Sequence, residues 1–164
     1  MRFVTRIFAL YMRLRHRKPP ETILRHQYGP DAAEHLYFIP AAPKALAKMP
    51  VVYFHGGGWI YGGADISTHR LLDIAAAGHP VFNVEYPLAP EHPHPQILRS
   101  TLAALTWIHR HHPEYESVHL MGDSAGANLA LMAAIIVSNP GLATSLGLDV
   151  PDDVPAIRSV VSIQ

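Results

Sequence analysis

The sequence predicts an α/β fold in which helices cover both faces of a mostly parallel sheet, and three observations lead to this prediction. Short apolar segments alternate with helical segments, an order that produces right-handed crossovers between parallel strands. The strand-like segments are apolar almost throughout, as expected for strands covered on both faces. The segment 125–138 is apolar nearly all round, which is typical of a helix buried against the centre of a sheet.

The expected elements follow in order along the chain. Two short strands at 22–29 and 34–40 surround a Gly-Pro turn and predict an antiparallel N-terminal hairpin. A compact β-branched and aromatic strand at 51–55 stops at three glycines. The remaining expected elements are a helix at 68–78, a strand at 80–86, a helix at 95–111, a strand at 117–121, the helix at 125–138, a loop at 139–155 and a strand at 157–164.

Composition limits the function. The 164 residues suit one domain with an apolar core, and 13 basic residues cancel 13 acidic ones, which argues against a nucleic-acid partner. The absence of cysteine excludes a disulfide framework, a thiolate zinc site and a cysteine nucleophile. The 12 histidines are scattered, and the densest group, at 109–114, is expected to be a solvated helix end rather than a metal site.

The first 20 residues are predicted to form an amphipathic helix that is separate from the rest of the domain. At helical spacing, residues 1–20 place apolar side chains on one face and arginines on the other, and Pro19 and Pro20 end the helix. Two uses of this amphipathic helix stay open: a cap over the cleft of the domain, or peripheral contact with an anionic membrane surface. No run is long enough to span a membrane and no signal peptide is recognised, so we expect a cytoplasmic protein.

A G-x-S-x-G sequence lies between an expected strand and an expected helix: Gly122, Asp123, Ser124, Ala125 and Gly126. In this context the turn is so sharp that the serine needs a strained backbone, which lifts its hydroxyl clear of the sheet edge. A larger residue at either glycine would collide with the neighbouring strand or helix. The helix behind the serine contributes its positive end and the free amide of Ala125.

A second glycine-rich turn follows the strand at 51–55 and reads His55, Gly56, Gly57, Gly58, Trp59. Three glycines let the backbone come close to a ligand with its amides turned inward. Two of these amides and that of Ala125 could surround an anionic oxygen, which is an oxyanion hole. A plain turn and a helix N-cap are the alternatives for the two segments taken separately. The patterns of phosphate-binding loops are absent.

Three segments together resemble a known family: "HGGGW" (55–59), "EYPLAPEHPHP" (85–95) and "GDSAGA" (122–127). They resemble the hormone-sensitive-lipase-like branch of the α/β-hydrolase fold, most strongly over 50–164. The resemblance implies an incomplete α/β-hydrolase domain over 21–164, with residues 1–20 as a cap-type helix. It implies hydrolysis of small carboxylic esters without metal or cofactor.

The same resemblance assigns roles to individual residues. It makes Ser124 the catalytic nucleophile and the amides of Gly57, Gly58 and Ala125 the oxyanion hole. The residues that support the two motifs are His55, Gly56, Gly122, Asp123 and Gly126. Of these, His55 is expected to be structural, and Asp123 is expected to point away from the serine.

A serine needs a base to remove its proton, and none stands in the expected place. In this fold the acid and the histidine of the triad follow the serine in the chain, but the last histidine here is His119. The sheet is therefore expected to be truncated after about its sixth strand. Neither His55 nor His119 is expected to replace the base.

Three hypotheses stay open at this point. The first is a serine carboxylesterase represented by its amino-terminal portion. The second is an inactive remnant that keeps an acyl-binding pocket. The third is a membrane-surface or interaction module. Independently of these, the uncharged, β-rich segment 159–164 predicts self-association through an exposed strand edge.

Overall fold

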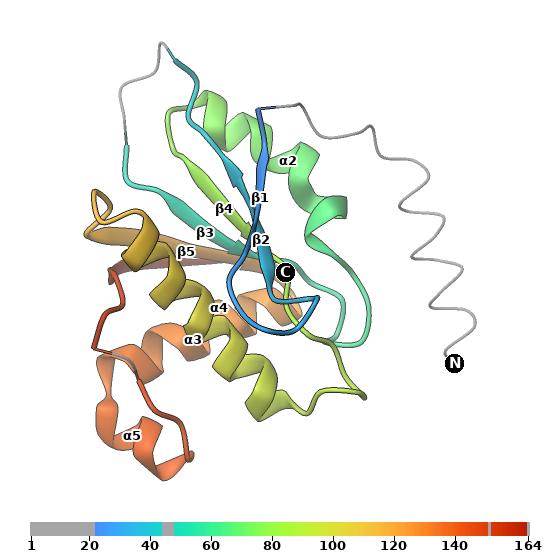
Figure 1. Ribbon diagram of the computed structural model, residues 1–164, viewed down its shortest axis with the longest axis vertical. Helices are drawn as coiled ribbons and strands as arrows, with labels where there is room; N and C mark the ends of the chain where they lie inside the picture. Colours follow the sequence, from blue (N-terminus) through green and yellow to red (C-terminus); the bar gives the residue numbers. More distant parts are fainter. Residues whose placement is uncertain (1–21, 44–47, 151, 164) are drawn as a thin grey trace.

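The computed structural model describes residues 22–43, 48–150 and 152–163 (Figure 1). The helix expected over 1–20 lies outside these residues. The described strands form one sheet in the order β1-β2-β4-β3-β5-β6. Their bounds are β1 Leu24–Gln27, β2 His35–Ile39, β3 Val51–Phe54, β4 Val81–Val84, β5 Ser117–Asp123 and β6 Ala156–Ile163.

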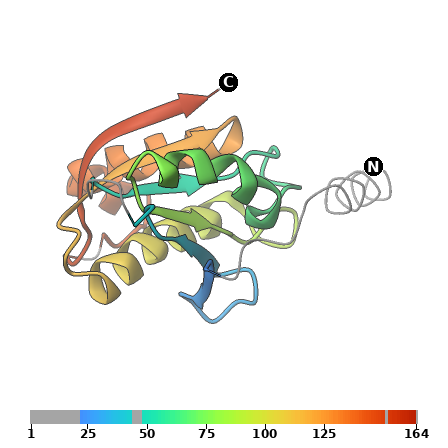
Figure 2. The same ribbon diagram turned by 90° about the horizontal axis from the view of Figure 1, so that it is seen from above.

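The sheet has the predicted mixed character. Strand β2 pairs antiparallel with both β1 and β4, and β4, β3, β5 and β6 run parallel to one another. The predicted N-terminal hairpin is therefore confirmed as β1–β2. Figure 2 shows β6 as the outermost strand, beside α4.

Helices cover both faces of the sheet, as predicted. Their bounds are α2 Ala64–Ala76, α3 His94–His111, α4 Ala125–Ser138 and α5 Pro140–Ser145. Alternate side chains of β3 point to opposite faces of the sheet and pack with different helices. Val52 and Phe54 are fully buried in the core formed with α3 and α4, whereas Val51 and Tyr53 pack with Leu71 of α2. None of the helices within the described ranges is long and apolar enough to cross a membrane.

The structure differs from the sequence-based expectation at the start of one helix and in one expected loop. Helix α2 begins at Ala64 rather than at residue 68, because the Glu85 carboxylate accepts a hydrogen bond from the Ala64 amide (2.6 Å) and closes the first turn. The expected loop at 139–155 contains α5, which begins with Pro140. The Asn139 side chain caps this helix by accepting a hydrogen bond from the Leu142 amide (3.1 Å).

The expectation that the helix at 125–138 is buried is also only partly right. One side of α4 packs on the sheet through residues such as Leu129 and Ile136, both fully buried. On its outer side, Leu131 is 49% exposed and Ile135 is 39% exposed. An all-round apolar sequence therefore did not distinguish a helix covered on every side from one that keeps an exposed side.

Candidate active site

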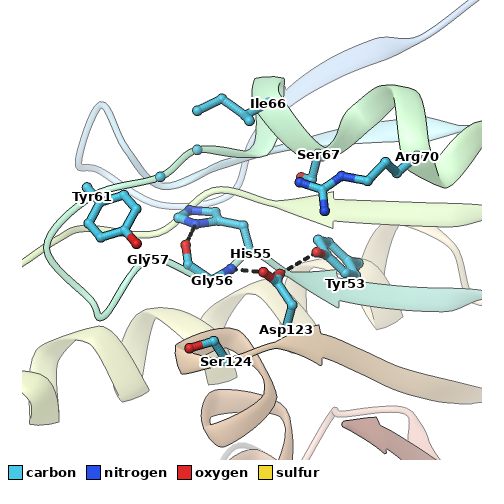
Figure 3. A pocket seen from close by; sticks show the side chains of 12 residues that line it. Tyr53, His55, Gly56, Gly57, Tyr61, Ile66, Ser67, Arg70, Asp123 and Ser124 are labelled. Atoms are coloured by element: carbon cyan, nitrogen blue, oxygen red, sulfur yellow. Dashed lines mark hydrogen bonds between the residues drawn. The ribbon is translucent and has the colours of Figure 1, made fainter. Parts of the chain in front are cut away.

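The strand register brings the two glycine-containing turns together. Strands β3 and β5 are parallel neighbours, and Phe54 pairs with Gly122. The turn after β3 and the turn after β5 therefore leave the same edge of the sheet side by side. Ser124, Gly56 and Gly57 line one cavity at this edge (Figure 3).

Ser124 has the strained backbone that the sequence predicts. Its φ of 49° and ψ of −114° place a non-glycine residue at positive φ, a conformation that costs about 1–3 kcal/mol and persists only where neighbours enforce it. The Ser124 amide donates to the Ile163 carbonyl of β6 (2.8 Å), and its carbonyl accepts from the Asn128 amide (3.2 Å). The serine is exposed at the amino end of α4.

Both glycines that flank the serine are required by close backbone contacts. A Cβ on Gly122 would meet the backbone of Gly126 and Ala127, and a Cβ on Gly126 would meet the carbonyl oxygens of Phe54 and His55. No flexible side chain is involved, so relief would require moving α4 away from β5 for Gly122 and away from β3 for Gly126. The predicted collision on both sides is therefore confirmed.

The turn after β3 has a backbone conformation that favours glycine. Gly57, Gly58 and Trp59 all have positive φ, at 127°, 59° and 60°. The Gly57 carbonyl accepts hydrogen bonds from two amides later in the turn, each 3.1 Å long, which closes the loop. A second cavity, of about 400 Å³, is lined by Gly58, Trp59, Ser124 and Ala125.

The three amides expected to form an oxyanion hole are available for a ligand. Within the described ranges, the amides of Gly57, Gly58 and Ala125 donate to no backbone or side-chain acceptor. Ala125 is the first residue of α4, so its amide has no intrahelical acceptor. Ser124 lines both cavities at this edge, together with Gly57 in one and with Gly58 and Ala125 in the other.

Asp123 connects the two turns, a contact that the sequence did not predict. Its carboxylate accepts hydrogen bonds from the Gly56 amide (2.8 Å) and from the Tyr53 hydroxyl (Figure 3). Burial and the hydrogen bond to Asp123 raise the pKa of Tyr53 above its usual range, so the phenol stays a donor. As expected, the Asp123 side chain points away from Ser124, towards Gly56 and Tyr53 (Figure 3).

His55 is held in an ion pair on the far side of the same turn. Its Nε2 lies 3.3 Å from the Glu85 carboxylate, and its Nδ1 lies 2.8 Å from the Gly56 carbonyl. The Tyr86 ring stacks on the imidazole at a centroid distance of 4.3 Å, and the Tyr86 hydroxyl donates to the His55 carbonyl. In Figure 3 the imidazole points away from Ser124. The contacts with Glu85 and Tyr86 were missed because they join adjacent strands.

The pKa shifts of His55 and Glu85 both favour the charged form of the pair. Burial disfavours the imidazolium, but the adjacent Glu85 carboxylate and the Gly56 carbonyl outweigh it and raise the pKa of His55. Burial alone would raise the pKa of Glu85, but His55 and the Ala64 amide outweigh it and lower that pKa. A carbonyl oxygen can only accept a hydrogen bond, so Nδ1 of His55 carries a proton and donates to Gly56. In the imidazolium form, the second proton lies on Nε2 and faces Glu85.

The other candidate for a substitute base, His119, is engaged elsewhere. It lies within β5, and its Nδ1 is 2.8 Å from the Ser159 hydroxyl of β6. Neither His55 nor His119 is therefore arranged to accept the Ser124 proton. Within the described ranges, the site combines an exposed serine and free amides with no imidazole bonded to the serine.

The charged pair predicts a pH dependence of stability. The pKa of His55 rises on folding, so its contribution is complete below the reference value of 6.5 and is lost as pH rises through the folded-state value. The pKa of Glu85 falls, so its contribution is complete above 4.5 and is lost as pH falls through the folded-state value. We expect Glu85→Gln to destabilise the chain most between these two pH values, by about 2 kcal/mol.

Urea unfolding across pH measures this effect. The destabilisation by Glu85→Gln should shrink on the alkaline side and again in acid. The matched control is Glu116→Gln, at an exposed carboxyl, which should show a small, nearly pH-independent change. An equally flat profile for Glu85→Gln would contradict the charged pair.

Comparisons with known proteins agree with the fold. A family model described as alpha/beta hydrolase fold matches residues 51–157. The chain is 36% identical over 147 residues to the carboxylesterase NlhH of Mycobacterium tuberculosis, covering 79% of this chain and 44% of that protein. It is 36% identical over 115 residues to an acetyl esterase of Salmonella paratyphi B, covering 66% of this chain and 33% of that protein.

Solved structures give the same result. The structure of an inhibited esterase B of Lactobacillus rhamnosis matches with a TM-score of 0.78 and 25% identity, covering 98% of this chain and 54% of that one. A bacterial heroin esterase matches with a TM-score of 0.67 and 26% identity, covering 94% and 48%. The chain belongs to the α/β-hydrolase family, in its hormone-sensitive-lipase-like branch. It spans less than half the length of the curated relatives it matches.

Proposed function

We propose that this chain belongs to an esterase of small carboxylic esters in which Ser124 is the nucleophile and the base comes from outside residues 1–164. One observation carries the proposal: the serine is held at positive φ and lines two cavities, which Gly57 in one and Gly58 and Ala125 in the other also line, and within the described ranges the amides of these three residues donate no hydrogen bond. In the first step the Ser124 oxygen forms a bond to the acyl carbon, and the carbonyl oxygen becomes an anion facing these amides. Loss of one such donor typically costs about 3–4 kcal/mol of transition-state stabilisation.

The remaining steps complete the hydrolysis. Collapse of the tetrahedral intermediate expels the alcohol and leaves an acyl-serine, and water then releases the acid and restores the hydroxyl. The base that takes the serine proton is proposed to come from the part of the fold that follows the nucleophile in related enzymes. Similarity to a carboxylesterase and to an acetyl esterase supports a carboxylic ester, such as an acetyl ester, as the substrate.

Covalent labelling tests the nucleophile. The protein for this test, called the joined protein below, is residues 1–164 followed by the second half of the mycobacterial carboxylesterase. We expect a phosphonate probe to label one serine of residues 1–164, Ser124, as mapped by peptide mass spectrometry. Equal labelling of this portion in the Ser124→Ala variant would contradict the assignment and favour an inactive remnant or an interaction module.

We further propose that isolated residues 1–164 associate with a second copy through β6. Within the described sheet β6 pairs only with β5, and Val161 and Ile163 are 45% and 41% exposed. An edge strand with an apolar surface is a template for a further strand. We expect light scattering to show association at roughly tens of micromolar, and Val161→Lys to reduce it.

The matched control for association is Leu146→Lys, at a residue that is also 45% exposed but lies outside the sheet. It should leave association unchanged. A monodisperse monomer for the unaltered chain, or an equal effect of both lysines, would show that β6 is not the interface.

A further inference from the structure

The cavity beside Ser124 extends to helix α2, and this second wall carries a cation. The cavity has a volume of about 180 Å³ and reaches from Ser124, past the glycine turn, to Ser67 and Arg70 of α2. Figure 3 shows the Arg70 side chain running along α2 over Ser67, on the side of the cavity opposite the serine. A group bound with its carbonyl at Ser124 would therefore have its far end near the guanidinium.

The Arg70 charge is not neutralised by a carboxylate in direct contact. Within the described ranges the ion pairs join other residues, and none includes Arg70. The side chain is exposed at the cavity. An arginine of this kind offers a planar fork of donors that matches a carboxylate.

Asp123 is the opposing charge in the same cavity, and its surroundings limit its effect. Its carboxylate already accepts hydrogen bonds from the Gly56 amide and the Tyr53 hydroxyl. These two fixed donors stabilise the negative charge at the end of β5, whereas Arg70 can turn its donors towards a ligand. Repulsion from the Asp123 carboxylate reduces the affinity of the cavity for an anionic ligand. Arg70 is still the cationic side chain in this lining that can bind the anion.

The size of the cavity limits the ligand. A chain of a few carbon atoms ending in a carboxylate fits the volume of about 180 Å³ between Ser124 and Arg70.

We infer that this cavity receives the free carboxylate end of a half-ester of a short dicarboxylic acid, and that Arg70 binds that carboxylate. This inference rests on the proposed function, because it assumes that the ester carbonyl lies at Ser124. It names Arg70 as a residue that sets substrate specificity.

Equilibrium binding tests this inference without requiring turnover. The Ser124→Ala chain is titrated by ligand-observed NMR with monomethyl succinate, dimethyl succinate and methyl 4-aminobutanoate, which are anionic, neutral and cationic esters of similar size. We expect the anionic ester to bind roughly fivefold more tightly than the neutral one, as for a partly exposed charge pair. Added salt should reduce this preference.

Variants identify the residue responsible. Arg70→Met should abolish the preference, and Arg99→Met, at an exposed arginine of α3 that donates to the Gly147 carbonyl, should preserve it. Circular dichroism checks that each variant is folded. Equal binding of the anionic and neutral esters, or tighter binding of the amine, would overturn the inference while leaving an ester-binding site in place. Absence of binding by every ester would overturn both the inference and the proposed function.

Discussion

Residues 1–164 alone are expected to show no practical turnover of p-nitrophenyl acetate. The imidazole of His55 is bound to Glu85 and that of His119 contacts Ser159, so neither takes the Ser124 proton. In a serine protease, loss of the catalytic histidine lowers kcat by about 10⁶. Applied to a typical kcat of about 10 s⁻¹, this gives a rate of about 10⁻⁵ s⁻¹.

The joined protein supplies the comparison, since its added half follows the serine, where the resemblance implies the acid and the histidine of the triad. We expect it to turn over the same ester at a rate that the Ser124→Ala variant reduces to background. Turnover near 1 s⁻¹ by residues 1–164, abolished by Ser124→Ala, would show that a base within this chain had been overlooked. The His55→Gln and His119→Gln variants would then identify it.

Replacing Gly126 by alanine is expected to cost more than about 3 kcal/mol of stability. The added Cβ would overlap the carbonyl oxygens of Phe54 and His55, which belong to the central strand and the glycine turn. Overpacking against backbone cannot be relieved by a rotamer change, so its cost lies at the upper end for such substitutions. The displaced turn would also carry the Gly57 amide away from Ser124.

Gly141→Ala provides the matched control. A Cβ there meets only the Asn139 side chain, at 3.5 Å, and Gly141 lies in α5. Removing a glycine from a helix should raise stability by roughly 0.5–1 kcal/mol. Urea unfolding of both variants measures the difference. A loss below about 1 kcal/mol for Gly126→Ala would show that α4 can move away from β3 at little cost.

Local sequence signals predicted the parts of the site that are local in the chain. The positive φ of Ser124 follows from a serine between two glycines at a strand-to-helix turn, and the parallel strands follow from the alternation of elements. The same kind of signal was present but unused at Asn139 and Pro140, where an N-cap followed by proline begins α5.

The parts that could not be predicted depend on strand order. Asp123 contacts Tyr53 because β3 and β5 are neighbours, and Glu85 contacts His55 because β4 lies on the other side of β3. Nothing in the spacing along the chain indicates either neighbour. The exposed side of α4 was missed for a related reason, since hydrophobicity does not reveal which elements cover a helix.

The structure of the phosphonate adduct of the joined protein tests the central claim most directly. The account predicts a covalent bond between phosphorus and the Ser124 oxygen. It further predicts that one phosphonyl oxygen lies about 2.7–3.1 Å from the amide nitrogens of Gly57, Gly58 and Ala125. A phosphonyl oxygen directed away from these amides, or a probe bound to another residue, would contradict it.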